Sequence, residues 1–297
     1  MANLTLKQMR YFETLSRTGH FGRAADLAGI SQPALSMQIK EMEETLGVTL
    51  FERAAREVRL TRFGEDLVPR IRAILRSVDE VGDLARLAQD RLSGRLRLGV
   101  IPTIAPYLLP AFIGRLTHAY PDLDLQVRET MTQTLIEELN DGKLDAAILA
   151  LPISEPGLEE VAIFDEDFVL IRPEEDAARP VPAASELETM QLLLLEEGHC
   201  FRDQALAFCN LRTGLPREGL DGSSLSTLVQ LVGSGIGVTL IPEMAVPIEA
   251  RSARVDVARF KAPCPSRTIG MVWRKTSPLA EQLREIAKIV DQAALPA

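Results

Sequence analysis

Two cysteines in the second half of the chain are the side chains best suited to covalent chemistry. Cys200 follows His199 and the flexible Gly198, and it stands at the start of a helix predicted from about Phe201 onward. A helix N-terminus and neighbouring cationic groups, here His199 and Arg202, favour the thiolate, which is the nucleophilic form of cysteine. We therefore predict a reactive thiol at Cys200. The alternative is a small buried apolar side chain, which is what most free cysteines are.

Cys209 lies nine positions after Cys200. Nine residues of intact helix rise roughly 13.5 Å, whereas a disulfide needs Cα atoms within about 7 Å of each other. A bond between this pair would therefore require the intervening helix to unwind, and it would act as a conformational switch. The deduction fails if residues 201–208 already form a compact loop. The third cysteine, Cys264, has no partner in any motif and is expected to be structural or incidental.

A pattern typical of DNA binding occupies the first sixty residues. The small residues of Ala24–Ala28 suit closely packed helices, and Gly29 ends that segment. Ser31 is a good N-cap for a second helix with Pro33 in its first turn, and Gly47 stops it. Two short helices joined by a glycine turn predict a helix-turn-helix, whose second helix can enter the major groove.

Polar and basic side chains around this motif are candidate DNA contacts. Hydrogen-bonding side chains on the second helix can read base edges, while arginines near the alternating Val58 and Leu60 suggest a two-stranded wing that faces phosphate. The predicted DNA-binding residues are Ser31, Gln32, Pro33, Ser36, Gln38, Lys40, Arg53 and Arg56. The alternative is a generic three-helix module with a solvated basic face.

Charge and composition narrow the class of protein. Residues 1–62 carry nine basic and seven acidic side chains although the whole chain has a net charge of −9, which suits a small nucleic-acid-binding module on an acidic body. Three cysteines in 297 residues argue against a disulfide-stapled secreted scaffold. The start of the chain lacks the pattern of a signal peptide, and its apolar runs are too short to span a bilayer. We expect a cytoplasmic protein that does not associate with membranes.

The residues after the wing predict a long helix. Apolar side chains recur there at spacings of four and three, namely at Leu67, Ile71, Ile74, Val78, Val81, Ala85 and Ala88. This heptad seam predicts a two-stranded coiled coil, which would pair two DNA-binding heads over a pseudo-palindromic operator. The alternative is a helix packed on its own domain.

Strand-like runs alternate with helical stretches in the rest of the chain, which predicts parallel α/β layers. The candidate strands are Arg95–Ile101, Leu123–Arg128, Ala146–Ala150, Phe168–Ile171, Leu192–Leu195, Val238–Ile241 and Ile269–Trp273.

The N-terminal motifs resemble those of LysR-type transcriptional regulators. The matching runs are Ser31-Gln32-Pro33-Ala34-Leu35-Ser36, Leu46-Gly47 and Leu50-Phe51-Glu52-Arg53. This resemblance implies an α/β protein with a winged helix-turn-helix over 1–62, a linker and dimerisation helix over 63–93, and a regulatory domain over 94–297. That domain would have two Rossmann-like lobes similar to periplasmic binding proteins. Lobe I would comprise 94–165 and 268–297, and lobe II 166–267.

The segments 198–209 and 99–110 resemble, more narrowly, the hydrogen-peroxide-responsive activators of that family. The resemblance implies that peroxide oxidises Cys200 to a sulfenic acid, which condenses with Cys209 to a disulfide. It also implies changed pairing of subunits in a homotetramer that binds double-stranded DNA and contacts RNA polymerase. Ser226 departs from the pattern, since an acidic residue is common there, and so does the segment 210–216.

Further site residues carry over from the same resemblance. Thr103 and Thr132 would hydrogen-bond peroxide or a water molecule, His199 would flank the pocket, and Arg267 would stabilise the thiolate and the leaving hydroxide. The alternatives are ordinary helix capping for the two threonines and a surface ion pair for Arg267.

Two other functions compete with redox-controlled transcription. One is a LysR-type regulator that binds a small metabolite non-covalently in the cleft between the lobes. The other is a thiol peroxidase, which the helix-turn-helix argues against. We therefore expect a regulator that is not an enzyme and that has no cofactor and no metal site.

Overall fold

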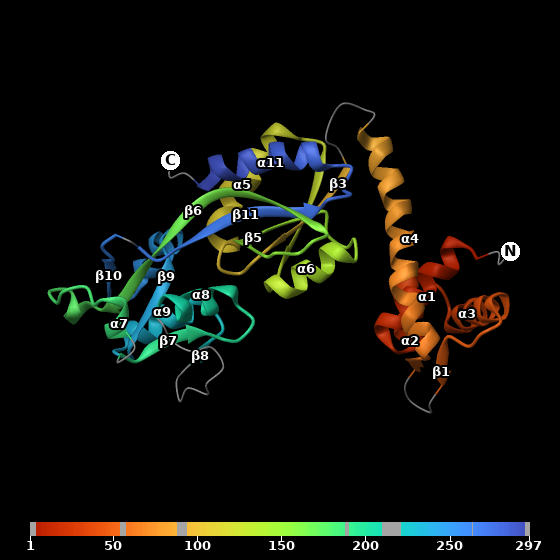
Figure 1. The fold of residues 1–297 in the computed structure, drawn as a ribbon, viewed down its shortest axis with the longest axis horizontal. Helices are drawn as coiled ribbons and strands as arrows, with labels where there is room; N and C mark the ends of the chain where they lie inside the picture. Colours follow the sequence, from red (N-terminus) through yellow and green to blue (C-terminus); the bar gives the residue numbers. More distant parts are fainter. Residues whose placement is uncertain are drawn as a thin grey trace. The chain divides into compact units, whose positions relative to one another are not determined.

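The computed structural model describes residues 4–53, 58–87, 94–187, 190–209, 221–262 and 264–294. The chain divides into two compact units, Met1–Ala85 and Arg86–Ala297, each described separately below. Figure 1 labels their helices and strands. In the described part of the chain, no helix is both long and apolar enough to cross a membrane.

The N-terminal unit is the predicted winged helix-turn-helix. Its elements are α1 (Leu6–Thr18), α2 (Phe21–Ala28), α3 (Gln32–Leu46), β1 (Phe51–Arg53), β2 (Val58–Leu60) and α4 (Arg62–Leu87). The Ser31 hydroxyl caps α3 by accepting from the Ala34 N–H at 3.4 Å, and Gly47 ends it in the left-handed conformation at φ 69°. Phe12, Leu35 and Ile39 lie fully buried in the core between these helices. The expected helix boundaries and the antiparallel wing are confirmed.

The wing is tied to α3 by a carboxylate. Glu43 of α3 accepts hydrogen bonds from the backbone N–H groups of Leu50 at 2.7 Å and Phe51 at 3.2 Å. Leu50 lies directly before β1, and Phe51 is the first residue of that strand. Glu43 therefore fixes the angle between the second helix of the motif and the wing.

The start of α4 packs on its own unit. Ile71 is buried in the core of the winged helix-turn-helix, and Leu67 packs against the same core. Ile74 and Val81, by contrast, are 42% and 65% exposed in the single chain. The first two positions of the predicted seam are thus used within the unit, and the exposed positions further along α4 remain available to a partner.

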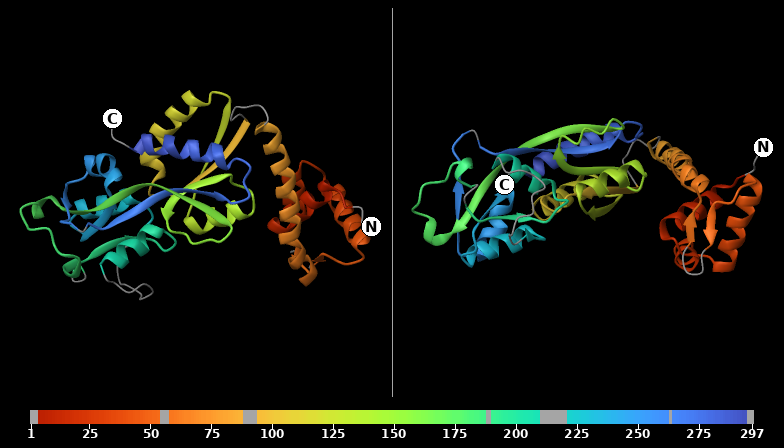
Figure 2. Two further views of the ribbon diagram at one scale, coloured as in Figure 1. Left: turned by 45° about the horizontal axis from the view of Figure 1, so that its top comes forward. Right: turned by 60° about the horizontal axis from the view of Figure 1, so that its bottom comes forward.

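The second unit is built on one sheet with helices packed against it (Figure 2). Its strands are β3 (Gly94–Val100), β4 (Leu123–Glu129), β5 (Ala146–Leu151), β6 (Leu158–Pro173), β7 (Leu192–Leu195), β8 (Asp221–Gly222), β9 (Val238–Pro242), β10 (Val255–Arg259) and β11 (Ser266–Arg274). Its α-helices are α5 (Ala105–Ala119), α6 (Thr132–Asn140), α7 (Ala184–Leu187), α8 (Cys200–Phe208), α9 (Leu225–Gly233), α10 (Val246–Glu249) and α11 (Ala280–Ala294). Short 3₁₀ turns are η1 (Glu174–Asp176), η2 (Glu243–Ala245) and η3 (Ala250–Ser252).

The expectation of parallel layers is only partly right. β3 pairs in parallel with β4 and β5, and β7 pairs in parallel with β8 and β9. β6 and β11 instead pair antiparallel with each other, β11 pairs antiparallel with β5, and β6 pairs antiparallel with β9 and β10. These two long strands run side by side from one half of the unit to the other, as Figure 1 shows, so the sheet is mixed.

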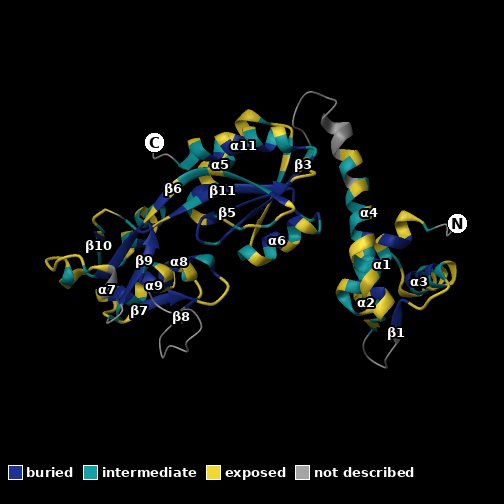
Figure 3. Ribbon diagram, viewed as in Figure 1, coloured by how far each residue is buried: buried dark blue, intermediate teal, exposed yellow. Residues whose placement is uncertain are grey.

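Two hydrophobic clusters lie on this sheet, and the buried strands that carry them are dark blue in Figure 3. Cluster I gathers side chains of β3, β5, β11, α5 and α11, among them the fully buried Phe112 and Trp273. Cluster II gathers side chains of β6, β7, β9, α8 and α9, among them Phe168 and Phe201. The turns that connect strands to helices between the two clusters form the candidate site.

Replacing Glu43 by Ala leaves two backbone N–H groups without their acceptor, so we expect the free energy of unfolding of the N-terminal unit to fall by about 1–3 kcal/mol. Glu44→Ala is the matched control, because the Glu44 side chain pairs with Lys40 at 3.4 Å and both side chains are largely exposed. It should change stability by no more than about 0.5 kcal/mol. Chemical denaturation of both variants measures the effect, and equal losses would contradict the proposed anchor.

Candidate functional site

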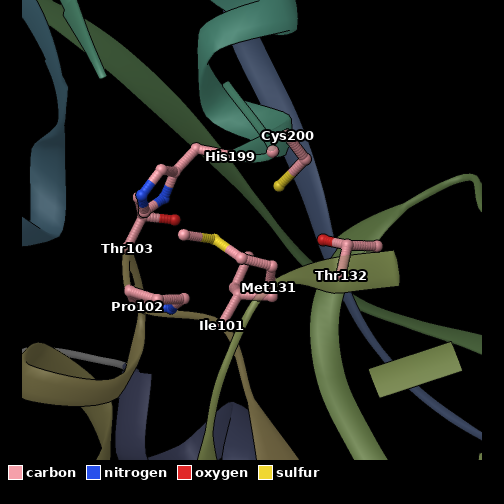
Figure 4. A pocket seen from close by; sticks show the side chains of 8 residues that line it. Ile101, Pro102, Thr103, Met131, Thr132, His199 and Cys200 are labelled. Carbon is pink, nitrogen blue, oxygen red and sulfur yellow. The ribbon is translucent and has the colours of Figure 1, made fainter. Parts of the chain in front are cut away.

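Three turns enclose a small pocket (Figure 4). They follow β3, β4 and β7, and they lead into α5, α6 and α8. The pocket holds about 170 Å³ of space, part of it open to solvent. Its lining residues are Ile101, Pro102, Thr103, Met131, Thr132, Gly198, His199 and Cys200. Four of the side chains predicted for the thiol site, Thr103, Thr132, His199 and Cys200, therefore meet at one place.

The two cysteines of interest stand at opposite ends of α8. Cys200 is the first helical residue, is half-buried and packs against cluster I. Cys209 follows the last helical residue, is fully buried and belongs to cluster II. Neither cysteine forms a disulfide in this structure. The prediction of an intact helix between them is confirmed, so these ends are separated by a rise of roughly 13.5 Å.

Thr132 directs an unpaired hydroxyl toward the thiol. Its Oγ1 is buried and has no hydrogen-bond partner among the described residues. In Figure 4 this oxygen and the sulfur of Cys200 point into the same space. Helix capping does not account for it, because Met131 holds the N-cap position of α6 and no side chain caps that helix. A buried hydroxyl without a partner is costly, so a small polar molecule in the pocket would satisfy it.

Thr103 presents its hydroxyl differently. It is 3% exposed, and its Oγ1 accepts a hydrogen bond from Nη1 of Arg267 at 2.8 Å. The carbonyl oxygen of Thr103 accepts from Nη2 of the same arginine at 3.1 Å. Ile104 occupies the N-cap of α5, so Thr103 does not cap that helix. Because its oxygen already accepts from Arg267, the hydroxyl hydrogen of Thr103 is available to donate to a ligand.

Arg267 is a buried group, so the alternative of a surface ion pair is wrong. Its Nε and Nη2 contact Oε2 of Glu166 at 2.8 and 2.7 Å. Its guanidinium also lies over the ring of Phe201, 5.4 Å from the centroid. Burial raises the pKa of the Glu166 carboxyl, and the charge of Arg267 opposes that shift. Glu166 was not predicted as a site residue, because it lies between Asp165 and Asp167 in a strand and carries no motif.

His199 does not supply the cation expected beside the thiol. It is 5% exposed, and loss of hydration lowers its pKa, while the charge of Glu196 opposes the shift only in part. The imidazole is therefore neutral near pH 7. Arg202 donates from Nη1 to the carbonyl of Leu195 at 2.6 Å, at the end of β7. Cys200 itself is the first residue of α8 and therefore lies at the positive end of the helix dipole.

Hydrogen bonds to the carboxylate of Glu249 join α5 to the elements of cluster II. The Tyr107 hydroxyl donates to Oε1 of Glu249 at 2.8 Å, and the Ser226 hydroxyl donates to Oε2 of the same carboxylate at 2.6 Å. Burial, followed by this hydrogen bond, raises the pKa of Tyr107. An acidic residue is thus present next to Ser226, but it comes from α10. Cys264 donates weakly to the carbonyl of Phe260 at 3.2 Å, which agrees with a structural role.

The predicted DNA contacts lie around α3. Ser31, Gln32, Pro33 and Lys40 are exposed, whereas Ser36 and Gln38 are half-buried. Gln38 donates from Nε2 to Glu41 at 2.8 Å, so this side chain is engaged within the helix in the absence of DNA. Arg53 is the last residue of β1, and its side chain is not described. Arg56 lies outside the described residues.

The lowered pKa of His199 makes stability depend on pH. The unfolded chain takes up a proton near the ordinary pKa of about 6.5, before the folded chain does, so stability falls as the pH is lowered through that value. We expect the melting temperature of the wild type to drop more between about pH 7.5 and 5.5 than that of His199→Gln. Replacing the exposed His118 by Gln is the control and should leave the wild-type pH dependence. Parallel curves for His199→Gln and the wild type would contradict a buried neutral imidazole.

Comparisons with known proteins agree with this arrangement. The model of the LysR substrate binding domain matches residues 89–294, and that of the bacterial regulatory helix-turn-helix protein, lysR family, matches residues 6–65. A probable hydrogen peroxide-inducible genes activator of Mycobacterium leprae is 42% identical over 293 residues, covering 97% of this chain and 94% of that protein. The Escherichia coli DNA-binding transcriptional dual regulator OxyR is 38% identical over 289 residues, covering 97% and 95%.

Solved structures give the same result. A full-length OxyR variant from Pseudomonas aeruginosa is similar with a TM-score of 0.77 and 36% identity, covering 97% of this chain and 98% of that one. A mutant of Corynebacterium glutamicum OxyR with bound hydrogen peroxide is similar with a TM-score of 0.66 and 37% identity, covering 97% and 92%. The matched domains, their order and their coverage show that this chain belongs to the family of LysR-type transcriptional regulators.

Proposed function

We propose that this chain is a hydrogen-peroxide-sensing transcriptional regulator in which Cys200 is the peroxide-reactive thiol and Cys209 the resolving thiol. The observation that carries the proposal is the pocket at Cys200, where the unpaired hydroxyl of Thr132 faces the thiol at the start of an intact helix. The relatives described as hydrogen peroxide-inducible activators, and the peroxide-bound OxyR structure, support it.

The first step oxidises Cys200. Its thiolate attacks one oxygen of hydrogen peroxide, the S–O bond forms as the O–O bond breaks, and the departing hydroxide takes a proton to become water. Negative charge develops on that departing oxygen. Thr103, supported by Arg267, and Thr132 are the hydroxyl donors placed around the pocket to stabilise it. The neutral His199 forms part of the wall and holds no charge.

The second step forms the disulfide. The thiol of Cys209 attacks the sulfenic sulfur of Cys200, the S–S bond forms and water leaves, so one peroxide is consumed for each pair of thiols. Because α8 separates the two ends, its residues must leave the helical conformation. Phe201, Ala205 and Cys209 are buried in cluster II, so this change also disturbs the packing under α8. Local oxidation is thereby converted into a rearrangement of the regulatory domain.

The proposal extends to assembly and partners. We assign DNA binding to 1–62, pairing of chains to the helix of 63–93 and sensing to 94–297, with lobe I as 94–165 and 268–297 and lobe II as 166–267. The exposed Ile74 and Val81 support pairing through α4. We also propose that the chain forms a homotetramer on a pseudo-palindromic double-stranded operator. It would contact RNA polymerase and act in the cytoplasm. One turnover for each switching event suffices, so catalytic turnover of peroxide is not required.

Binding of a metabolite at this site is disfavoured by size. Pockets for small organic ligands usually enclose about 300–1,000 Å³. The pocket at Cys200 holds about 170 Å³, including space open to solvent. Hydrogen peroxide has only two non-hydrogen atoms, so it needs much less space than a metabolite, and the hydroxyl groups of two lining residues, Thr103 and Thr132, can donate to its oxygens.

We expect equimolar peroxide to produce an intramolecular disulfide between Cys200 and Cys209 in the wild type. Cys209→Ser should stop at the sulfenic acid, which dimedone traps, and Cys200→Ser should bind DNA but lose its peroxide response. Cys264→Ser is the matched control and should form the disulfide normally. Mass spectrometry of the alkylated protein distinguishes these products. Unchanged thiols in treated wild type, together with a response to a metabolite, would favour the alternative function.

Thr132→Val removes the unpaired hydroxyl while keeping the shape of the side chain. We expect sulfenic acid formation in the Cys209→Ser background to slow about 10- to 100-fold, because one donor to the peroxide is lost. Stability should rise, by up to about 1–3 kcal/mol, because the buried group without a partner is gone. Thr132→Ser keeps the hydroxyl and should react nearly normally. A variant that is both less stable and fully reactive would show that Thr132 serves only the fold.

A further inference from the structure

The ion pair between Arg267 and Glu166 is almost completely buried. The two side chains are 0% and 4% exposed. Removing two charges from water costs several kcal/mol for each ion, and an apolar pair would often serve stability equally well. A pair kept at such a place therefore points to a role beyond holding strands together. Its position beside the pocket indicates what that role is.

Glu166 fixes the direction of the guanidinium. Its Oε2 contacts Nε at 2.8 Å and Nη2 at 2.7 Å, and a planar group held at two nitrogen atoms cannot rotate freely. With those nitrogens fixed, Nη1 points at Oγ1 of Thr103 at 2.8 Å. One lone pair of the Thr103 hydroxyl is occupied in this way, so its hydrogen is available to donate to a molecule in the pocket that Thr103 lines. The carboxylate therefore acts on the pocket through two intervening groups.

The same carboxylate also accepts a hydrogen bond from η2. Oε1 of Glu166 accepts from the N–H of Met244 in η2 at 3.3 Å. Arg267 in turn lies over Phe201, the residue after Cys200 in α8. Strands β6 and β11, the turn before α5 and the first turn of α8 are thus held in register around one ion pair. A shift of Glu166 would therefore change the surroundings of Cys200 in two ways, through Thr103 and through Phe201.

We propose that Glu166 is a positioning residue for the oxidation of Cys200, an inference that rests on the proposed function. It orients Arg267 so that Thr103 donates its hydroxyl hydrogen to the oxygen that leaves when the O–O bond breaks. The cation behind Thr103 strengthens that donor as negative charge develops on the oxygen. Glu166 itself does not touch the peroxide.

Glu166→Gln tests this role. The amide has one acceptor oxygen where the carboxylate has two, so it cannot serve both Arg267 and the Met244 N–H, and its charge is lost. We expect the rate constant of sulfenic acid formation, measured in the Cys209→Ser background, to fall about 10- to 100-fold. Glu159→Gln is the matched control, because Glu159 lies on the same strand and pairs with Arg284 at 2.7 Å in a much more exposed setting. It should stay within about twofold of the parent.

A double-mutant cycle with Thr103→Val separates positioning from a merely structural role. If Glu166 acts through Thr103, Glu166→Gln should cost little further rate once Thr103 is Val. Independent losses that multiply, or a Glu166→Gln variant that reacts like its parent, would overturn the inference. Should Glu166→Gln fail to fold, Glu166→Asp keeps the charge, shortens the reach and enters the same cycle. A wild type whose Cys200 is not oxidised by peroxide would instead refute the proposed function.

Discussion

The rigid length of helix α8 is the constraint on which the proposed switching mechanism depends. A nine-residue helix holds Cys200 at its first position, and Cys209 follows immediately after its last. The two thiols also belong to different hydrophobic clusters, so each is held by a different part of the packing. As long as backbone hydrogen bonds keep α8 intact, a sulfenic acid at Cys200 and the thiol of Cys209 cannot meet. The energetic barrier to the disulfide is therefore the stability of one short helix and its contacts.

The pocket at Cys200 contains two hydroxyl groups that are held in place before any reaction. Thr132 offers a hydroxyl without a partner among the described residues, and Thr103 offers a hydroxyl that already accepts one hydrogen bond from Arg267. Each arrangement costs folding free energy, through an unsatisfied group in one case and a buried ion pair in the other. Polar groups that are fixed in advance at a reaction centre lower the stability of the fold. Here they lie where a small polar oxidant could bind.

Local signals in the sequence predicted much of this structure. The Ser31 cap and the Gly47 stop located α3 because such signals depend only on neighbouring residues. The start of α8 at Cys200 followed from the turn at Gly198 in the same way. The orientation of β6 and β11 could not be predicted, because the partners of a strand are distant in the sequence. Packing between residues distant in the sequence likewise determines that Leu67 and Ile71, the first two seam positions of α4, cover the core of the N-terminal unit.

The candidate site shows the same division. Residue types at matching motif positions identified Cys200, Thr103, Thr132 and Arg267, and all of them line or adjoin the pocket. The charge of His199 was predicted wrongly, since burial lowers its pKa and only the tertiary structure reveals that burial. The partner of Arg267 was missed for a related reason, because nothing local distinguishes one acidic residue in β6 from its exposed neighbours.

Complete burial of Cys209 has a consequence for how the reduced protein behaves among other cellular thiols. A side chain with no exposed surface is shielded from glutathione and from alkylating agents, so it cannot be capped prematurely. It becomes reachable only after the structure around it has opened. In the proposed switch, accessibility therefore sets the order of events, because Cys209 cannot be modified by an external reagent before Cys200 has reacted and the surrounding structure has opened.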